Sequence, residues 1–290
     1  MADPRFCCVL ASDAHYFYHA KPCIESLRAA LRPIRGVDVT IVLVSMDLAP
    51  DQRAWAEAQG VEVHEPHPAV PRYPDAPAHT YALTCRPYLP TIVPGYDGYA
   101  WVDTDLRFLR PEGIAHFMGQ GLRADTTIVI APECDPAYVM MNDLVGATRW
   151  LTGRDARVKR IWGREILRRQ RMMPNLNAGL FAAPSHSPFW AAFQKRLGEV
   201  FAFSHVRMYD QDALNVAVLD LGHYVRAPTT MNWICSWALP VRGEDGSWRH
   251  PDFPREPIYT LHLTNSEVRH TLDGRRERLY DIYRRVGLPV

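Results

Sequence analysis

The chain has 290 residues, 47% hydrophobic and 22% charged, and its 33 basic residues balance its 32 acidic ones to a formal net charge of +1. This composition is ordinary for a globular protein of one large or two small domains. The near-neutral charge excludes the general basic signature of nucleic-acid-binding proteins, so we expect no nucleic-acid partner.

The N-terminus and the cysteines indicate a protein that is neither exported nor inserted in a membrane. Residues 1–6 lack a basic segment followed by a long apolar stretch, and no apolar run approaches the roughly 18 residues of a spanning helix. The six cysteines form no C-x-x-C pair, which favours buried thiols in a reducing compartment. We expect a cytoplasmic location, with peripheral contact at the inner face of a membrane as an open alternative.

Apolar runs alternate with helical patterns, and this order predicts an α/β fold. Continuous apolar strands are typical of a mainly parallel central sheet with helices on both faces. Ligands bind such sheets beyond the carboxyl ends of the strands, where we expect Asp13 and Asp103. The predicted strands are 6–11, 37–44, 61–63, 126–131, 175–183 and 259–263, and a further strand ends at residue 102. One predicted helix has Ile24, Leu27 and Leu31 on one face, and the other predicted helices are 51–59, 80–89, 189–201 and 210–221.

Two carboxylates, Asp103 and Asp105, follow the apolar residues 99–102. Two acids at the end of a buried strand need a compensating charge, and a divalent cation is the usual one. Hard oxygen ligands suit Mg²⁺ or Mn²⁺, which keep open positions for substrate phosphates. A cap or turn role for Asp103 is the alternative, because Asp-x-Asp is common by chance and recurs here at 210–212.

Several further segments stand in a specific order around this motif. Together they resemble the retaining GT-A glycosyltransferases, particularly family 8, over about residues 6 to 265. The segments are Ala11-Ser12-Asp13-Ala14-His15-Tyr16, Arg86, Trp101-Val102-Asp103-Thr104-Asp105, Asn177-Ala178-Gly179-Leu180, Tyr209-Asp210-Gln211-Asp212 and Tyr259-Thr260-Leu261-His262.

The resemblance implies a donor site and a metal site. Asp103 and Asp105 match the pair that holds Mn²⁺ or Mg²⁺ against the diphosphate of a nucleotide sugar, with His262 as third protein ligand. The donor is expected to be UDP-linked. The implied donor-binding positions are Ala11, Asp13, Tyr16, Arg86, Asp103, Thr104, Asn177, Ala178, Gly179 and Arg269. Since Gly179 lacks a Cβ, we expect its backbone to approach the sugar closely.

The resemblance also implies a catalytic pair and an acceptor. Asp210 and Gln211 match the residues beneath the sugar ring, where an oxygen would support an oxocarbenium-like centre. The implied reaction transfers a sugar to a hydroxyl of a saccharide or glycolipid acceptor, with retention. Structural roles are the alternatives for these residues. Asp13 and Asp210 could cap helices, and Arg86 could form an ion pair. Asn177 and Gly179 could belong to a β-bulge or a turn, and His262 could be a core residue.

The chain departs from the family after His262. Asn265 stands where the family usually has Gly, Val268 where it has Lys, and Arg269 follows one residue later. We therefore expect a GT-A domain at 1–265 and a basic helical extension at 266–290. In that extension Leu279, Ile282 and Tyr283 would share one helix face packed on the domain; an interfacial helix on anionic lipid is the alternative.

A second basic segment spans 154–171. A solvated helix face is the default interpretation, and grip on an anionic acceptor is the functional one. We expect the acceptor to enter past residues 138–171. Two other functions stay open: a nucleotidyltransferase that makes sugar nucleotides, although residues 11–16 offer no glycine for a phosphate loop, and a GT-A protein that binds a donor without turnover.

Overall fold

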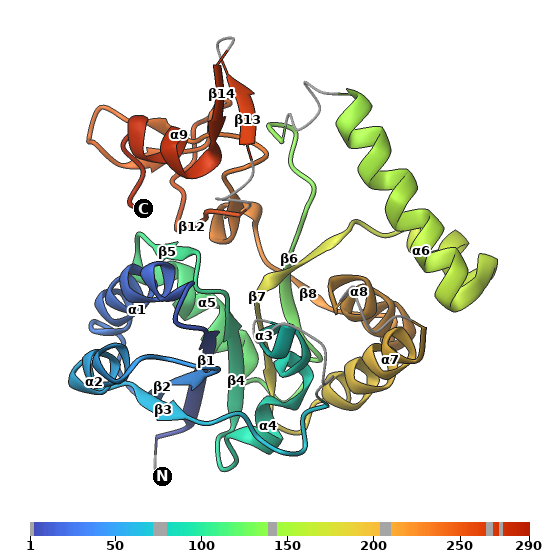
Figure 1. Cartoon of the computed structure of the whole chain (residues 1–290), viewed down its shortest axis with the longest axis horizontal. Coiled ribbons are helices and arrows are strands. Elements are labelled where there is room, and N and C mark those ends of the chain that lie inside the picture. The colour runs from blue at the N-terminus through green and yellow to red at the C-terminus, as the bar shows by residue number, and fades with distance from the viewer. Residues whose placement is uncertain (1–2, 72–79, 139–143, 204–209, 265–268, 273–274) are drawn as a thin grey trace.

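The structure is a computed structural model, and it describes residues 3–71, 80–138, 144–203, 210–264, 269–272 and 275–290 (Figure 1). The side chains of 144–151 and 269–276 are outside this description. Within the described residues, no helix combines the length and apolarity that crossing a bilayer requires.

A seven-stranded sheet forms the centre of the molecule, in the order β3-β2-β1-β4-β7-β6-β8. All neighbouring strands are parallel except that β7 runs antiparallel to both β4 and β6. The predicted mainly parallel sheet is therefore confirmed. The strands are β1 (Arg5–Ser12), β2 (Asp38–Ser45), β3 (Glu62–His64), β4 (Gly98–Val102), β6 (Val129–Pro132), β7 (Leu176–Pro184) and β8 (Val225–Arg226).

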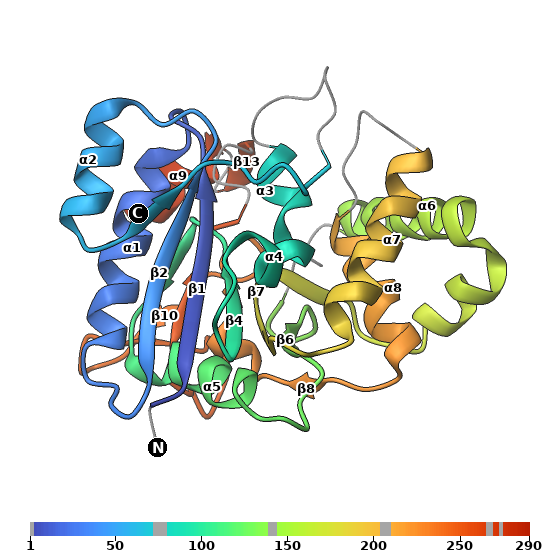
Figure 2. The same cartoon turned by 90° about the horizontal axis from the view of Figure 1, so that it is seen from below.

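Helices cover both faces of this sheet, as predicted. Side chains alternate along β1, so that Cys8 and Leu10 pack on one face and Cys7 and Val9 on the other, all fully buried. Figure 2 shows α1 and α2 on one side of the strands and α3, α4 and α7 on the other. The first face is covered by α1 (Phe17–Leu31), α2 (Pro50–Ala58) and α5 (Pro111–Gly121), and the second by α3 (Thr80–Thr84), α4 (Leu89–Ile92), α7 (Phe189–Phe203) and α8 (Asp210–Leu221).

One predicted helix is broken. Instead of a single helix over 80–89, α3 is followed by a 3₁₀ turn, η1 (Arg86–Tyr88), and then by α4. The reason is Pro87, which has no N–H to continue the helical hydrogen bonds and whose ring obstructs the preceding turn. The break leaves Arg86 buried at the turn.

Smaller elements pack against one end of the sheet. Three strands, β5 (Leu106–Phe108), β12 (Thr260–His262) and β9 (Trp233–Ile234), form a second sheet in which β12 is antiparallel to β5. Among the other elements, the long helix α6 (Leu144–Gln170), which has a non-helical residue at Gly163, packs against α7 and α8. The 3₁₀ turn η3 (Thr229–Met231) and the hairpin of β10 (Val241–Arg242) and β11 (Trp248–Arg249) lie between β8 and β12 in the chain.

The C-terminal extension differs from the predicted helix. Strands β13 (Arg269–Leu272) and β14 (Arg275–Arg278) pair antiparallel, and α9 (Leu279–Arg285) begins only after them. In the sequence, Asp273-Gly274 between them is a dipeptide typical of two-residue hairpins, a signal that the helical interpretation overlooked; these two residues lie outside the described part of the structure. Leu279, Ile282 and Tyr283 do share the buried face of α9, where they join a cluster with Trp233 and Leu261.

Candidate active site

The sheet topology brings the predicted site segments to one edge. Strands β1, β4 and β6 run in the same direction, so their carboxyl ends share that edge. Because β7 is antiparallel, its first residues, including Asn177, lie at the same edge. The residues that follow the strand ends, Asp13, Asp103 and Glu133, therefore converge.

Three potential metal ligands lie together at the end of β4. One ligand atom from each of Asp103, Asp105 and His262 lies within 4.8 Å of the others. The register of the small sheet explains the third member: His262 pairs with Leu106, and the N–H of Leu263 donates to the carbonyl of Asp105. The His262 Nε2 lies 3.2 Å from Asp105 Oδ1 and 3.8 Å from Asp103 Oδ2.

This donor set fits a divalent cation. Two carboxylates and one imidazole are oxygen and nitrogen ligands of the kind that Mn²⁺ accepts, and a triad of protein ligands leaves positions for substrate oxygens. Gly179 provides the space: a Cβ there would lie 2.1 Å from His262 Cε1 and 2.9 Å from Asp103 Oδ2. The glycine is thus required for the approach of these ligands, and the close approach of its backbone to a sugar stays a prediction.

Arg86 connects Asp103 to the helix that carries the predicted catalytic pair. Its Nη2 donates to Asp103 Oδ1 at 2.6 Å, and its Nη1 donates to Asp210. The guanidinium also lies over the Trp101 ring, whose Nε1 donates to Asp103 Oδ1 at 2.6 Å. An arginine can make this forked contact because its donors are arranged in one plane.

Burial and neighbouring charges shift the acids and the histidine differently. Burial, with repulsion from Asp105, raises the pKa of Asp103 although Arg86 opposes the change. For Asp105, burial alone would raise the pKa, but the nearby His262 lowers it overall. Burial would lower the pKa of His262, but the two carboxylates outweigh it and raise that pKa above 6.5. Opposed shifts in one cluster are typical of functional sites.

Two cavities meet at this cluster. The first, of about 400 Å³, lies at the end of β1; it is lined by Ala11, Asp13, Tyr16, Arg86, Asp103, Thr104 and Asp105, all predicted positions, together with Ser12, His15, Met46, Ala82, Leu83 and Trp101. Asp13 also accepts the N–H of Tyr16 at 2.6 Å and so closes the turn before α1, whose N-cap is Tyr16 rather than Asp13.

The second cavity, of about 330 Å³, lies on the other side of Arg86. It is lined by Asn177, Gly179, Asp210, Gln211 and His262, all predicted positions, as well as by Arg86, Asp103, Asp105, Glu133, Ile234, Trp237 and Thr264. Ala178 takes part through its backbone, since its N–H donates to Gln211 Oε1 at 3.2 Å. Arg269 begins β13, and its side chain is outside the described part of the structure.

Glu133 is the site residue that the sequence interpretation missed. It directly follows β6, as Asp103 follows β4, and that position was the available signal. Its carboxylate accepts hydrogen bonds from the side-chain amides of Asn175, Asn177 and Gln211, the latter two at 2.8 and 3.0 Å. Burial raises the pKa of Glu133, and these three donors only partly offset the shift.

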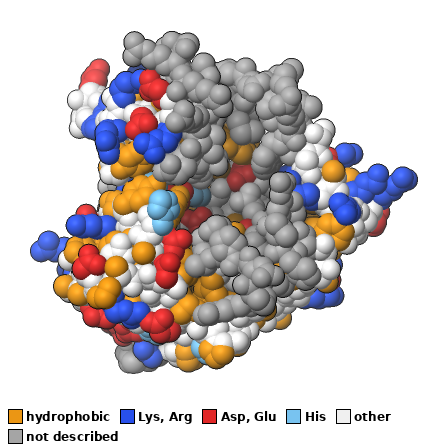
Figure 3. Space-filling view, in the orientation of Figure 1, with side chains coloured by type: hydrophobic (Ala, Val, Ile, Leu, Met, Phe, Trp, Pro, Cys, Tyr) orange, Lys and Arg blue, Asp and Glu red, His pale blue; other side chains and the backbone are white. Residues whose placement is uncertain are grey.

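The surface around the site is uneven in charge. Figure 3 shows acidic and histidine side chains in the hollow at the centre of that face, beside segments outside the described residues. Basic side chains project where α6 lies, and they include the exposed Lys159, Arg160, Arg164, Arg168 and Arg169. The predicted basic segment is therefore largely a solvated helix face.

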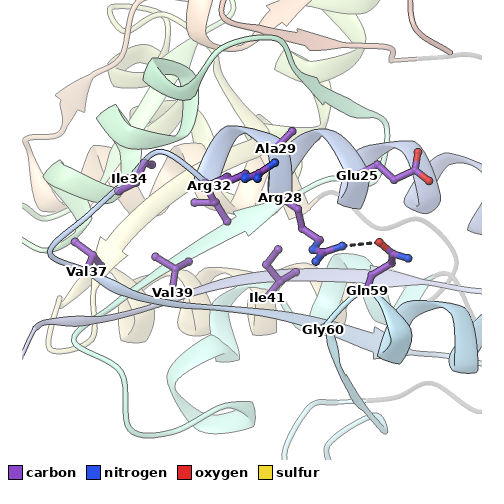
Figure 4. Close-up of a pocket in the computed structure, with 11 residues that line it drawn as sticks. Glu25, Arg28, Ala29, Arg32, Ile34, Val37, Val39, Ile41, Gln59 and Gly60 are labelled. Carbon is purple, nitrogen blue, oxygen red and sulfur yellow. Dashed lines mark hydrogen bonds between the residues drawn. The ribbon is translucent and has the colours of Figure 1, made fainter.

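A larger groove, of about 740 Å³, lies away from this site between α1 and β2. Figure 4 shows aliphatic side chains of β2 along one wall, and Arg28 of α1 and Arg32, the residue after α1, along the other, with Arg28 donating to Gln59. Of the described residues that line it, only Glu25 carries a carboxylate. The groove therefore lacks a clustered carboxylate pair like that at the end of β4.

No family model and no curated protein sequence matches the chain. Solved structures do match. The galactosyltransferase LgtC, in complex with donor and acceptor sugar analogs, superposes with a TM-score of 0.53 at 15% identity over 88% of this chain and 86% of that chain. The bifunctional glycosyltransferase WbbM gives a TM-score of 0.55 at 12% identity, over 99% of this chain and 50% of that one. The chain has the GT-A glycosyltransferase fold.

A third structure gives the same result. Glycosyltransferase GlyE of Streptococcus pneumoniae TIGR4 matches the GT-A fold of this chain with a TM-score of 0.53 at 15% identity, over 91% of this chain and 55% of that one. Identities this low establish the fold alone, since one fold hosts many functions. The assignment to family 8 stays a prediction from the motifs, and the activity has to be argued from the site.

Proposed function

We propose that the chain is a metal-dependent glycosyltransferase that moves a hexosyl group from a UDP-sugar to a hydroxyl of a saccharide or glycolipid. One observation carries the proposal: Asp103, Asp105 and His262 meet where two cavities join, and Arg86 lines both. A nucleotide sugar has this arrangement of parts, with a diphosphate between a nucleoside and a sugar.

The two cavities suggest separate binding places for the nucleoside and the sugar of the donor. The cavity at the end of β1 would hold the nucleoside, with Ala11, Asp13 and Tyr16 in its wall. The cavity beyond Arg86 would hold the sugar, because its wall carries amides and carboxylates that bond to hydroxyls. The diphosphate would then lie beside the triad and Arg86.

The chemistry of the cluster suits departure of a diphosphate. A Mn²⁺ or Mg²⁺ held by Asp103, Asp105 and His262 would neutralise the negative charge that the leaving diphosphate develops. The imidazole ligand favours Mn²⁺ over Mg²⁺, which prefers oxygen alone. The raised pKa of His262 favours its protonated form, whereas a metal ligand must be the neutral imidazole, so protonation of this residue would compete with cation binding.

We assign the sugar side to three residues. Asp210 and Gln211 would support positive charge at the anomeric carbon, and retention of configuration is proposed from the family 8 motifs. Glu133 would bind a sugar hydroxyl: a carboxylate has about four lone-pair positions, and three amide donors occupy three of them.

The test is release of UDP from a panel of UDP-hexoses with Mn²⁺ and a mixture of simple saccharide acceptors. We expect release that stops in EDTA and returns with Mn²⁺. Pyrophosphate release from UTP and a sugar phosphate would instead indicate a nucleotidyltransferase. Mn²⁺-dependent binding of UDP-hexoses without release would identify a binding protein, and either result would overturn the proposal.

A further inference from the structure

Among the described residues, three side-chain amides donate to the carboxylate of Glu133. Asn177 Nδ2 and Gln211 Nε2 donate to its Oε1, and Asn175 Nδ2 donates to its Oε2. An amide can present either its oxygen or its nitrogen, and only the nitrogen end can bind an ionised carboxylate. Each amide must therefore be held in one of its two orientations.

A donor that cannot accept a hydrogen bond fixes each of these orientations. The N–H of Ala178 donates to Gln211 Oε1 at 3.2 Å, and the N–H of Gly179 donates to Asn177 Oδ1 at 2.9 Å. For Asn175 the corresponding donor is the guanidinium of Arg154, whose Nη1 lies 3.2 Å from Asn175 Oδ1. Two of the three orientations therefore depend on the main chain, and the third depends on a side chain from α6.

Arg154 is well placed for this role. It is 6% exposed, although α6 carries a strongly exposed basic face, and Asn175 is 9% exposed. One turn further along α6, Arg157 Nε donates to Asp212 Oδ2 at 2.8 Å, and Asp212 adjoins Gln211. A single turn of α6 thus reaches both the start of β7 and the start of α8.

We infer that Arg154 is a positioning residue, which fixes the amide of Asn175 and through it the sugar-facing carboxylate of Glu133; this inference rests on the proposed function. Without Arg154, the Asn175 amide can turn its oxygen toward Glu133. The carboxylate would then lose a donor on Oε2 and be repelled, and it would leave the orientation that the other two amides set. The alternative is that Arg154 only anchors α6 to the domain.

The experiment uses the full chain with Mn²⁺ and the UDP-hexose that the wild type turns over. Arg154→Met removes the donors at similar length, Arg154→Lys restores one, and Arg168→Met is the matched control, an exposed arginine of the same helix. We expect Arg154→Met to lower kcat by about 10- to 100-fold, as small displacements in a site do, with UDP affinity within about twofold of wild type. Arg154→Lys should recover part of kcat, and Arg168→Met should match the wild type.

A double-mutant cycle with Glu133→Gln separates positioning from anchoring. If Arg154 acts through Glu133, adding Arg154→Met to Glu133→Gln should lower kcat no further, because residues in one network are not additive. Multiplied losses, a parallel loss of UDP affinity, or an Arg154→Met rate equal to that of the control would each overturn the inference. A wild type that releases no UDP from any donor is a distinct result, which refutes the proposed function itself.

Discussion

Gly179 shows how one missing side chain makes the site possible. The space of its absent Cβ is filled by His262 and Asp103, which approach each other across β7. A methyl group there would overlap a buried imidazole that has little room to move, since His262 is 3% exposed. The positions of His262 and Asp103 therefore depend on the absence of a side chain at residue 179.

The first prediction is that Gly179→Ala weakens Mn²⁺ binding. Displacing His262 and Asp103 should reduce the affinity by about 10- to 100-fold, the range seen when groups that orient metal ligands are lost. Titration of Mn²⁺ followed by the electron paramagnetic resonance of the free ion measures this directly. Gly119→Ala is the control, because nothing lies within 4 Å of its Cβ position. Equal Mn²⁺ affinity in Gly179→Ala and Gly119→Ala would refute the claim that Gly179 makes room for the metal ligands.

Arg86 gives a second prediction, on stability. Its charge compensates Asp103 and Asp210, which are themselves largely buried. Arg86→Met should lower the free energy of unfolding in urea by about 3–5 kcal/mol, because it leaves buried charges without a partner. Arg86→Lys should lose less, since it keeps a charge but not the fork.

The control for Arg86 is Arg123→Met. Arg123 pairs with Asp125 on the surface, where both side chains are more than half exposed. Exposed pairs contribute at most about 1 kcal/mol, so this variant should unfold close to the wild type. If Arg86→Met were no less stable than Arg123→Met, the buried network would not stabilise the fold.

At the scale of elements, the loop after β6 ties the site to the C-terminal part of the chain. Asp135, two residues after Glu133, accepts hydrogen bonds from Thr229 at 2.6 Å, the N–H of Ala137 at 3.0 Å and His250 at 2.8 Å. His250 packs edge-on against Trp233, beside β12. The loop that carries Glu133 is thereby fixed to the sheet that carries His262.

This connection predicts a pH-dependent stability. Burial would raise the pKa of Asp135, but its hydrogen bonds lower that pKa below 3.8. A lowered native pKa means that the stabilisation is present above the ordinary value and is lost as pH falls through the native value. Asp135→Asn should therefore be about 1–3 kcal/mol less stable than the wild type near neutral pH.

Urea denaturation over a pH series checks this expectation. The difference between wild type and Asp135→Asn should shrink only below the ordinary aspartate pKa of 3.8. A difference that stays constant into acid, or that vanishes already near neutral pH, would contradict the role of the ionised carboxylate.

At the scale of the whole molecule, the layers of the fold were predicted from the sequence, but a break in one helix and the C-terminal strand pair were not. Apolar runs such as that of β1 identify buried strands because burial on both faces requires continuous hydrophobicity. The helix break at Pro87 was open to prediction, as was the pairing of β13 with β14, since both follow from the local sequence, a proline in one case and an Asp-Gly dipeptide in the other.

In the candidate site, too, some residues could be predicted from the sequence and others could not. Asp103, Asp105 and His262 could be predicted because their order along the chain matches a family pattern, and the structure brings them together. The amide network around Glu133 could not, because it depends on which end of each amide faces the carboxylate. That choice is made by contacts between residues that lie 21 to 78 positions apart in the sequence.

The central claim is that the triad holds a cation which binds a nucleoside diphosphate. Calorimetric titration of UDP in Mn²⁺ and in EDTA tests it most directly, with the wild type, Asp105→Asn and the exposed control Asp125→Asn. We expect UDP to bind the wild type and Asp125→Asn at least about tenfold more tightly with Mn²⁺, and Asp105→Asn to lose this gain. UDP affinity that is the same in Mn²⁺ and EDTA, or a gain that survives Asp105→Asn in full, would contradict the account.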